Sequence, residues 1–332
     1  MKKHFKLWTT IGIILLIFSI FFYLQMGYTK IPLREVVESM KGGEGTPNWY
    51  IIHEVRLPRI LTSILIGSIL SMCGLVFQGV LLNPLADPYT LGISSGASFG
   101  AALAIILNIT IFGIFSTHIV SFIFAILCLT VVIKMGSFER KMNPTSIILG
   151  GIIIGAFFSA GLSFLKYLAD EGVGAIIFWL LGSFTGKSWM EVSILSVVWV
   201  FGLVFFCYYA EDLNILALGE KNAISLGINP SKIRRILLVV SSILSAVAVS
   251  TCGIIGFVGL VVPHLLRFIM GTDNKKLIIG CAIWGGVIMG AADNVVRVVL
   301  PNDIPVGVIT SLLGAPFFAL IFRKKMGGGN LR

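Results

Sequence analysis

Charged residues are scarce in this chain of 332 amino acids. Only 12% of its residues are Asp, Glu, Lys or Arg, against 57% that are hydrophobic, and the mean hydropathy is +0.99. A soluble globule of this length needs far more polar surface to cover its core. The composition therefore excludes a soluble protein and predicts an integral membrane protein.

Clustered metal-ligating and catalytic residues are also lacking. The four histidines lie far apart, no HExxH pattern occurs, and the five cysteines fall singly within apolar runs without CxxC spacing. We expect these cysteines to be small buried residues rather than disulfides or ligands. No catalytic residue, metal site or enzymatic activity is therefore predicted. For His264, beside Pro263, a ligand role and a role in helix packing both stay open.

Neither nucleic acid nor nucleotide is an expected ligand. The net charge is +10, but the basic residues form short groups between apolar runs rather than one basic domain. The segment GSFTGKS at 182–188 resembles a phosphate-binding loop, which needs four residues between its glycines, whereas this segment has three. We therefore expect the chain itself to bind no nucleotide.

Long apolar runs are what the sequence does contain, and ten of them are expected to form membrane helices. The first follows MKKHFK and lacks a small-residue cleavage site, so we expect it to be retained rather than removed as a signal peptide. The run 236–270 is too long for one crossing and contains glycines and Pro263, so we divide it. The expected spans are 7–25, 58–82, 91–107, 112–133, 145–165, 190–209, 236–255, 256–270, 277–299 and 305–322.

Three shorter features lie between these spans. A surface helix is expected at 33–40 within the polar loop 26–55, and a helix too short to span is expected within 172–186. The segment Asn83-Pro84-Leu85-Ala86-Asp87-Pro88 must be a turn, because its prolines do not fit a continuous helix. After that turn, Gly92, Gly96 and Gly100 recur at four-residue spacing, which favours close helix packing.

The basic residues predict the orientation of the helices. With the N-terminus in the cytoplasm, 17 of the 25 basic residues lie inside. The other 8 are Lys30, Arg34, Lys41, Arg56, Arg59, Lys166, Lys187 and Arg297. An even number of crossings returns the C-terminus to the cytoplasm, where the basic group Arg323, Lys324 and Lys325 also favours it.

An internal repeat is predicted at an offset of 179 residues. This offset aligns Arg56 with Arg235, Cys73-Gly74 with Cys252-Gly253 and Pro84 with Pro263. The aligned helices are five crossings apart, so the two halves are expected to be inverted copies with the pathway between them.

Two polar sites are candidates for function. Asp293 lies in an apolar segment one turn before Arg297, so a proton relay and a structural ion pair both stay open. The segment 216–227, LALGEKNAISLG, predicts a short amphipathic helix bounded by glycines, suited to docking on a partner. We expect Lys232, Arg234 and Arg235 to anchor the next helix at the lipid headgroups.

The chain resembles the permease subunits of bacterial ABC importers for ferric siderophores, haem and cobalamin. The motifs that carry the resemblance cover nearly the whole chain in the same order. They are RLPRIL at 56–61, NPLADPYTLGISSGAS at 83–98, LALGEKNAISLGI at 216–228, GFVGLVVPHLLR at 256–267 and IPVGVITSLLGAPFF at 304–318.

The resemblance implies an all-α fold of ten transmembrane helices with two inverted halves, like that of cobalamin permeases of the type II importers. The implied single permease domain covers 1–332. Its parts are helix 1 at 7–25, a first half at 56–166, helix 6 at 190–209, a cytoplasmic coupling loop at 211–235 and a second half at 236–325. The implied location is the bacterial cytoplasmic membrane.

The resemblance also implies partners and their sites. The partners are a second permease subunit, identical or similar, a cytoplasmic ATPase dimer that holds ATP and Mg, and an extracytoplasmic substrate-binding protein. The implied sites are a coupling helix with Leu218, Gly219, Glu220, Ala223, Leu226 and Gly227, docking arginines Arg56, Arg59 and Arg297, and a gate with Asn83, Leu85, Thr145 and Ser146. Pro144, before Thr145, departs from the family pattern and could change that gate.

A ferric siderophore is the expected cargo, with haem or cobalamin as the alternative. A proton-coupled carrier stays open as a different class of function, but it needs titratable residues near the membrane centre, and the sequence offers little besides Asp293.

Overall fold

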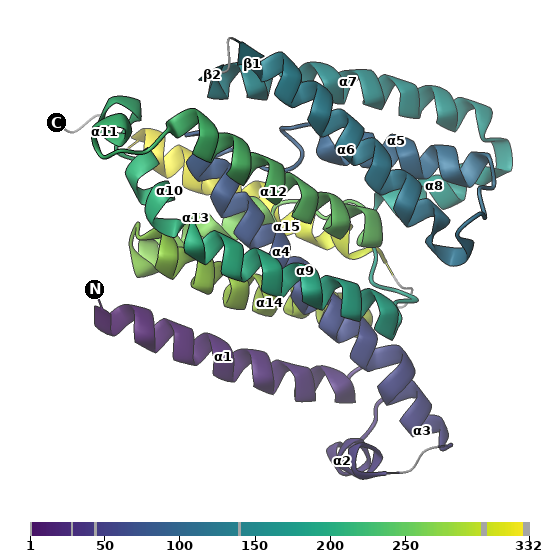
Figure 1. The fold of residues 1–332 in the computed structure, drawn as a ribbon. Helices are drawn as coiled ribbons and strands as arrows, with labels where there is room; N and C mark the ends of the chain where they lie inside the picture. The colour runs from purple at the N-terminus through teal and green to yellow at the C-terminus, as the bar shows by residue number, and fades with distance from the viewer. Residues whose placement is uncertain (1, 28, 43–44, 139–140, 300–303, 328–332) are drawn as a thin grey trace.

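The computed structural model describes residues 2–27, 29–42, 45–138, 141–299 and 304–327, and it is a helical bundle (Figure 1). Two-residue strands form the only described sheet, an antiparallel hairpin in which Ser137 lies opposite Met142. The longer helices are α1 (Lys2–Gln25), α4 (Leu57–Val80), α5 (Ile93–Ile106), α6 (Ser116–Gly136), α7 (Pro144–Leu168), α9 (Trp189–Tyr208), α12 (Pro230–Cys252), α13 (Val258–Met270), α14 (Asn274–Val299) and α15 (Val306–Gly327).

The shorter elements connect these helices. They are α2 (Leu33–Lys41), α3 (Pro47–Tyr50), the π-helix η1 (Ile51–Arg56), the 3-10 turns η2 (Gly113–Phe115) and η3 (Asp170–Gly172), α8 (Val173–Leu180), α10 (Ala210–Leu216), α11 (Glu220–Ser225), β1 (Ser137–Phe138) and β2 (Lys141–Met142). The helix α2 confirms the expected surface helix, and α8 confirms the short helix within 172–186.

Each of the ten expected spans corresponds to one apolar helix, which confirms the all-α membrane fold. Within the described residues, seven helices are long and apolar enough to cross a membrane, while α5, α13 and α15 contribute shorter apolar stretches. The expected ends differ by several residues in places. For example, α12 begins at Pro230 rather than 236, because the Asn229 side chain accepts a hydrogen bond from the Lys232 amide and caps the helix there.

The second membrane helix begins earlier than expected. A polar loop was predicted at 26–55, but α3, η1 and α4 form one continuous helix that begins at Pro47. The Thr46 hydroxyl caps its start by accepting a hydrogen bond from the Trp49 amide at 3.2 Å, and Pro47 occupies the first helical position. The π-helical turn η1 continues the helix through the polar residues His53, Glu54 and Arg56, which precede Leu57.

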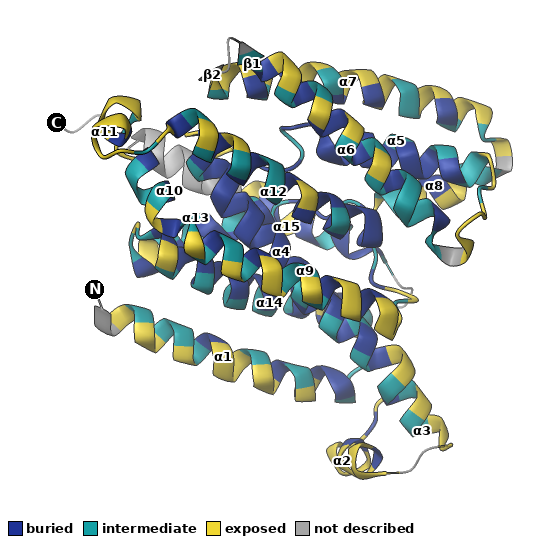
Figure 2. Ribbon diagram, viewed as in Figure 1, coloured by how far each residue is buried: buried dark blue, intermediate teal, exposed yellow. Residues whose placement is uncertain are grey.

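The helix α4 lies at the centre of the bundle. It packs against α14, α9, α12 and α13, and its most apolar window is 89% buried, compared with 22% for the peripheral α1. Figure 2 shows the contrast between the dark α4 and the mixed or exposed surfaces of α1, α7 and α9. A helix that is apolar on all sides is expected in such a central position.

Glycines let the backbones of α4 and its neighbours meet directly. A Cβ atom on Gly67 would overlap the Gly285 carbonyl oxygen of α14, and one on Gly74 would overlap the Gly259 carbonyl oxygen of α13. The glycines at four-residue spacing in α5 also allow close packing, since a Cβ on Gly96 would lie 2.8 Å from the Phe124 carbonyl oxygen of α6. Close approach through small residues is characteristic of membrane helices.

We expect Gly67→Ala to destabilise the protein, because the added methyl group must push α14 away from α4. The expected loss is about 1–3 kcal/mol, as for overpacking in other cores. The matched control is Gly174→Ala in α8, where a Cβ meets nothing within 4 Å. Thermal unfolding of both purified variants checks this, and equal melting temperatures would contradict the close approach.

The division of the run 236–270 is confirmed, but the repeat offset is wrong. Helix α12 ends at Cys252, and Gly253 follows with φ +75°. Its supposed counterpart Cys73-Gly74 lies in the middle of α4, which continues to Val80. Likewise Pro84 lies in a turn, whereas Pro263 lies inside α13. The matched letters therefore do not occupy equivalent places, although each half still contributes four apolar helices, α4 to α7 and α12 to α15.

Candidate functional site

The glycine-bounded segment 218–227, which we call the elbow, projects from one end of the bundle. Figure 1 shows α11 at the same end as the start of α1 and far from α2 and α3. Gly219 with φ +97° and Gly227 with φ +82° flank α11. These left-handed conformations favour glycine and turn the chain sharply at both ends of the short helix.

The elbow presents apolar side chains outward while one small residue anchors it. Ala223 is fully buried, and its amide donates to the Gly219 carbonyl at 3.0 Å. Leu218, Ile224 and Leu226 are each 59–60% exposed. Three exposed apolar side chains within the elbow, one of them on α11 and two beside it, form a surface suited to a partner's groove.

An ion pair joins the elbow to α12. Glu220 Oε2 lies 3.3 Å from Arg234 Nη1, and the Arg234 side chain is only 3% exposed. This corrects the expectation that Arg234 would reach lipid headgroups, because its guanidinium points into the protein toward α11. Movement of the elbow would therefore be passed to α12 through a buried arginine.

A second link, which sequence reasoning missed, joins α10 to the start of α14. The Asn214 side-chain oxygen accepts from the Asn274 backbone amide at 2.9 Å and from its side-chain amide at 2.8 Å. Burial would raise the pKa of the neighbouring Asp273 carboxyl, but bonds from Lys276, Asn214 and the Lys275 amide together lower it below its ordinary value. No sequence pattern predicts that Asn214 and Asn274 are in contact, because they are 60 residues apart in the chain.

The three arginines expected to dock a binding protein have partners inside the chain. The Arg56 guanidinium donates to the backbone carbonyls of Leu24 and Thr29, and the residue is 6% exposed. Arg59 donates two hydrogen bonds to Asp293 Oδ1, from Nε at 3.1 Å and from Nη2 at 2.9 Å. Arg297 Nε lies 3.5 Å from the other Asp293 oxygen. Docking by these residues stays a prediction, and it would require these internal contacts to be exchanged.

Asp293 and His264 were left open by the sequence, and the structure gives each a packing environment. Asp293 bridges α4 to its own helix through Arg59 and Arg297, so it has the structural ion pair. His264 packs edge-on against Phe268, with ring centroids 5.1 Å apart. Among the described residues, no group of three His, Cys, Asp or Glu side chains could hold a metal ion.

The expected gate residues lie in the turn after α4 and at the start of α7. Leu85 is 38% exposed in the turn after α4, and its amide donates to the Asn83 side chain at 2.9 Å. Thr145 and Ser146 are exposed in the first turn of α7, which Asn143 caps from the preceding position. All four residues are at least partly accessible in this single chain.

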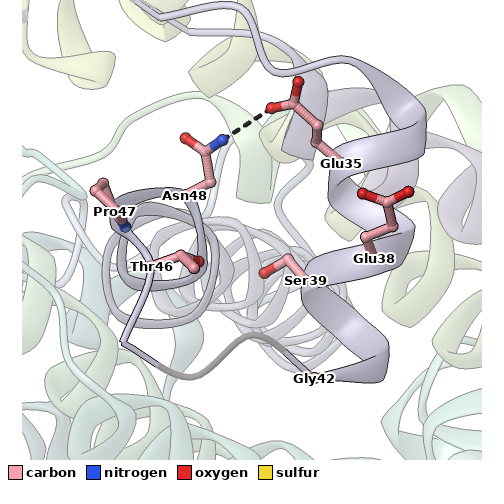
Figure 3. Close-up of a pocket in the computed structure, with 7 residues that line it drawn as sticks. All are labelled: Glu35, Glu38, Ser39, Gly42, Thr46, Pro47 and Asn48. Carbon is pink, nitrogen blue, oxygen red and sulfur yellow. Dashed lines mark hydrogen bonds between the residues drawn. The ribbon is translucent and has the colours of Figure 1, made fainter.

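A pocket of about 370 Å³ lies between α2 and α3, at the end of the bundle opposite the elbow (Figure 3). Its carboxylates are already engaged, because Glu35 accepts from the Asn48 amide at 2.8 Å and Glu38 accepts from Arg34 at 2.9 Å. The bond between Glu35 and Asn48 links α2 to α3, whereas the bond between Glu38 and Arg34 lies within α2.

The ten apolar helices of the described residues define a multi-pass membrane protein. The chain belongs to the FecCD transport family, whose model matches residues 15–324. An ABC transporter permease of Methanocaldococcus jannaschii is 37% identical over 97% of both chains. The molybdate import permease of Haemophilus influenzae is 36% identical, covering 84% of this chain and 83% of its own.

A solved structure agrees with this assignment. A metal-chelate type ABC transporter in an inward-facing conformation matches with a TM-score of 0.85 and 30% identity, covering 96% of this chain and 99% of its own. Further relatives are named for iron chelatin, cobalamin and hemin transport. The chain is thus an ABC permease subunit and not itself an enzyme, since ATP hydrolysis in such transporters belongs to a separate subunit.

Proposed function

We propose that this permease imports an iron(III)-siderophore complex across the cytoplasmic membrane. The likeness to a metal-chelate type transporter and to permeases named for iron chelatin supports this cargo. Haem and cobalamin are the alternatives, because relatives are also named for them. A wide, weakly binding pathway between two permease subunits would suit a bulky chelate.

The elbow is the observation on which the mechanism rests. We propose that Leu218, Ile224 and Leu226 seat in a cleft of a cytoplasmic ATPase, which holds ATP and Mg and moves the elbow when its dimer closes. The buried contacts of Ala223 and Arg234 then carry that movement into α12. In this proposal both termini are cytoplasmic, and a second permease subunit completes the pathway in a type II importer.

The opposite end of the bundle would receive an extracytoplasmic binding protein, near α2 and α3. Within the pathway, Asn83, Leu85, Thr145 and Ser146 are proposed to form the inner gate, because they are partly exposed in the turn after α4 and in the first turn of α7. Tilting of the two halves would open the cavity to one side at a time.

Reconstitution in liposomes tests this function. The permease is combined with its ATPase and binding protein, and uptake of radiolabelled ferric siderophores, haem, cobalamin and molybdate is compared. Uptake of a ferric siderophore that requires ATP and ignores a proton uncoupler supports the proposal. Uptake abolished by the uncoupler and independent of ATP would instead establish a proton-coupled carrier.

A further inference from the structure

A second cavity, of about 320 Å³, lies at the end of the bundle opposite the elbow. It is enclosed by the ends of α5 and α12, the start of α6, the helix α8 and the loop that follows it. That loop is the GSFTGKS segment, which the sequence analysis set aside because its glycine spacing does not suit a nucleotide. The proposed import mechanism assigns no role to this cavity.

The lining of this cavity is polar on one side and carries one fixed positive charge. Lys187 contributes the ammonium group, and Ser183 and Thr185 contribute hydroxyls, whereas the Thr251 hydroxyl donates to the Val247 carbonyl at 2.7 Å. Lys187 Nζ donates to the Thr251 carbonyl at 2.6 Å, which holds it against the cavity wall. An ammonium has three N–H donors, and this carbonyl takes one of them.

Negative charge is missing from the cavity itself. No aspartate or glutamate is among the described residues that line it. The nearest acidic influence on Lys187 is Glu191, whose carboxylate accepts from the Ser188 backbone amide at 3.0 Å and from the Ser188 hydroxyl as part of a helix cap. The lysine therefore has no carboxylate of its own within ion-pair distance among the described residues.

We propose that this cavity binds a small anionic group, either a carboxylate or an oxyanion, through Lys187 and the neighbouring hydroxyls. The volume is at the lower limit for ligand pockets, so it suits one such group rather than an entire chelate. Positive charge with hydroxyl donors in a confined site concentrates anions. The anion can come from two sources. One is a dissolved anion, including the charged arm of an anionic solute, and the other is the headgroup of a lipid with net negative charge.

Trp179 lines the same cavity and reports on its contents. The fluorescence of Trp179 is obtained as the difference between the wild type and Trp179→Phe, with the full chain in discs of neutral phosphatidylcholine. We expect iodide to quench this signal, and Lys187→Gln to lower the iodide quenching constant about fivefold, the effect of one unit charge at contact distance even in water. Quenching by neutral acrylamide is expected to stay unchanged, which shows that the fold is intact.

The control is Lys166→Gln, which removes a lysine in the last turn of α7, at the same end of the bundle but outside the cavity. The proposal is overturned if Lys187→Gln leaves the ratio of iodide to acrylamide quenching unchanged, or if Lys166→Gln lowers it equally. Competition by acetate or molybdate in neutral discs supports a dissolved anion. Loss of iodide quenching when phosphatidylglycerol is added supports a headgroup phosphate at the same site.

Discussion

Replacing Asp293 with alanine is expected to destabilise the folded chain by about 3–5 kcal/mol, because it removes the buried carboxylate that the Arg59 and Arg297 guanidinium groups both contact. The Asp293 side chain is 2% exposed, and those of Arg59 and Arg297 are 11% and 7% exposed. A desolvated cation is costly unless it is paired. Reversible unfolding of the purified protein in detergent measures the loss.

The exposed pair Arg34–Glu38 provides the control for this prediction. Its nitrogen and oxygen are also 2.9 Å apart, but its side chains are 88% and 60% exposed. Glu38→Ala should therefore cost less than about 1 kcal/mol. A triple variant with Arg59→Met, Asp293→Leu and Arg297→Met should recover most of the stability, since it buries no charge. Equal losses for Asp293→Ala and Glu38→Ala would refute the structural role.

The same variants decide whether Asp293 acts as a proton relay or as a structural ion pair. If the triple variant folds and still transports, neither a proton relay at Asp293 nor docking through Arg59 and Arg297 is needed. If it folds but fails to bind the extracytoplasmic partner, the docking prediction gains support despite the internal contacts of these arginines.

The second large effect is expected at the elbow, where the double substitution Ile224→Asp with Leu226→Asp should abolish ATP-driven uptake. Both side chains are about 60% exposed in this chain, so the change should not unfold it. If each residue is an interface hot spot worth about 2 kcal/mol, affinity for the ATPase falls about a thousandfold. Co-purification of the ATPase and uptake in liposomes measure the effect.

Leu33→Asp is the matched control for the elbow variant. Leu33 is 49% exposed on α2, at the far end of the bundle. It should retain both the ATPase and ATP-driven uptake. The coupling role is contradicted if the ATPase still binds the double variant, and the proposed orientation fails if a cysteine at position 224 is labelled from outside intact cells.

Local chemistry made several parts of this protein predictable. The turn at 83–88 and the break after α12 were correct, because Pro84 and Pro88 do not fit a continuous helix and Gly253 adopts φ +75°, a conformation that other residues avoid. The glycine-bounded elbow was correct for the same reason, since Gly219 and Gly227 adopt conformations that other residues avoid. Start positions were less accurate, because π-helical turns and side-chain caps extend helices through polar residues, as before α4 and α12.

The sequence by itself determined a ten-helix membrane protein with one glycine-bounded segment at 218–227, because hydrophobicity and backbone constraints act within short stretches of chain. Only the tertiary structure decided which polar residues face each other. Arg59 meets Asp293 across 234 residues, and Arg234 turns inward to Glu220 rather than outward to lipid. A charged side chain near a membrane avoids the free-energy cost of desolvation either by reaching water or by pairing with another charge. Only the packing of the helices decides which of these two is available.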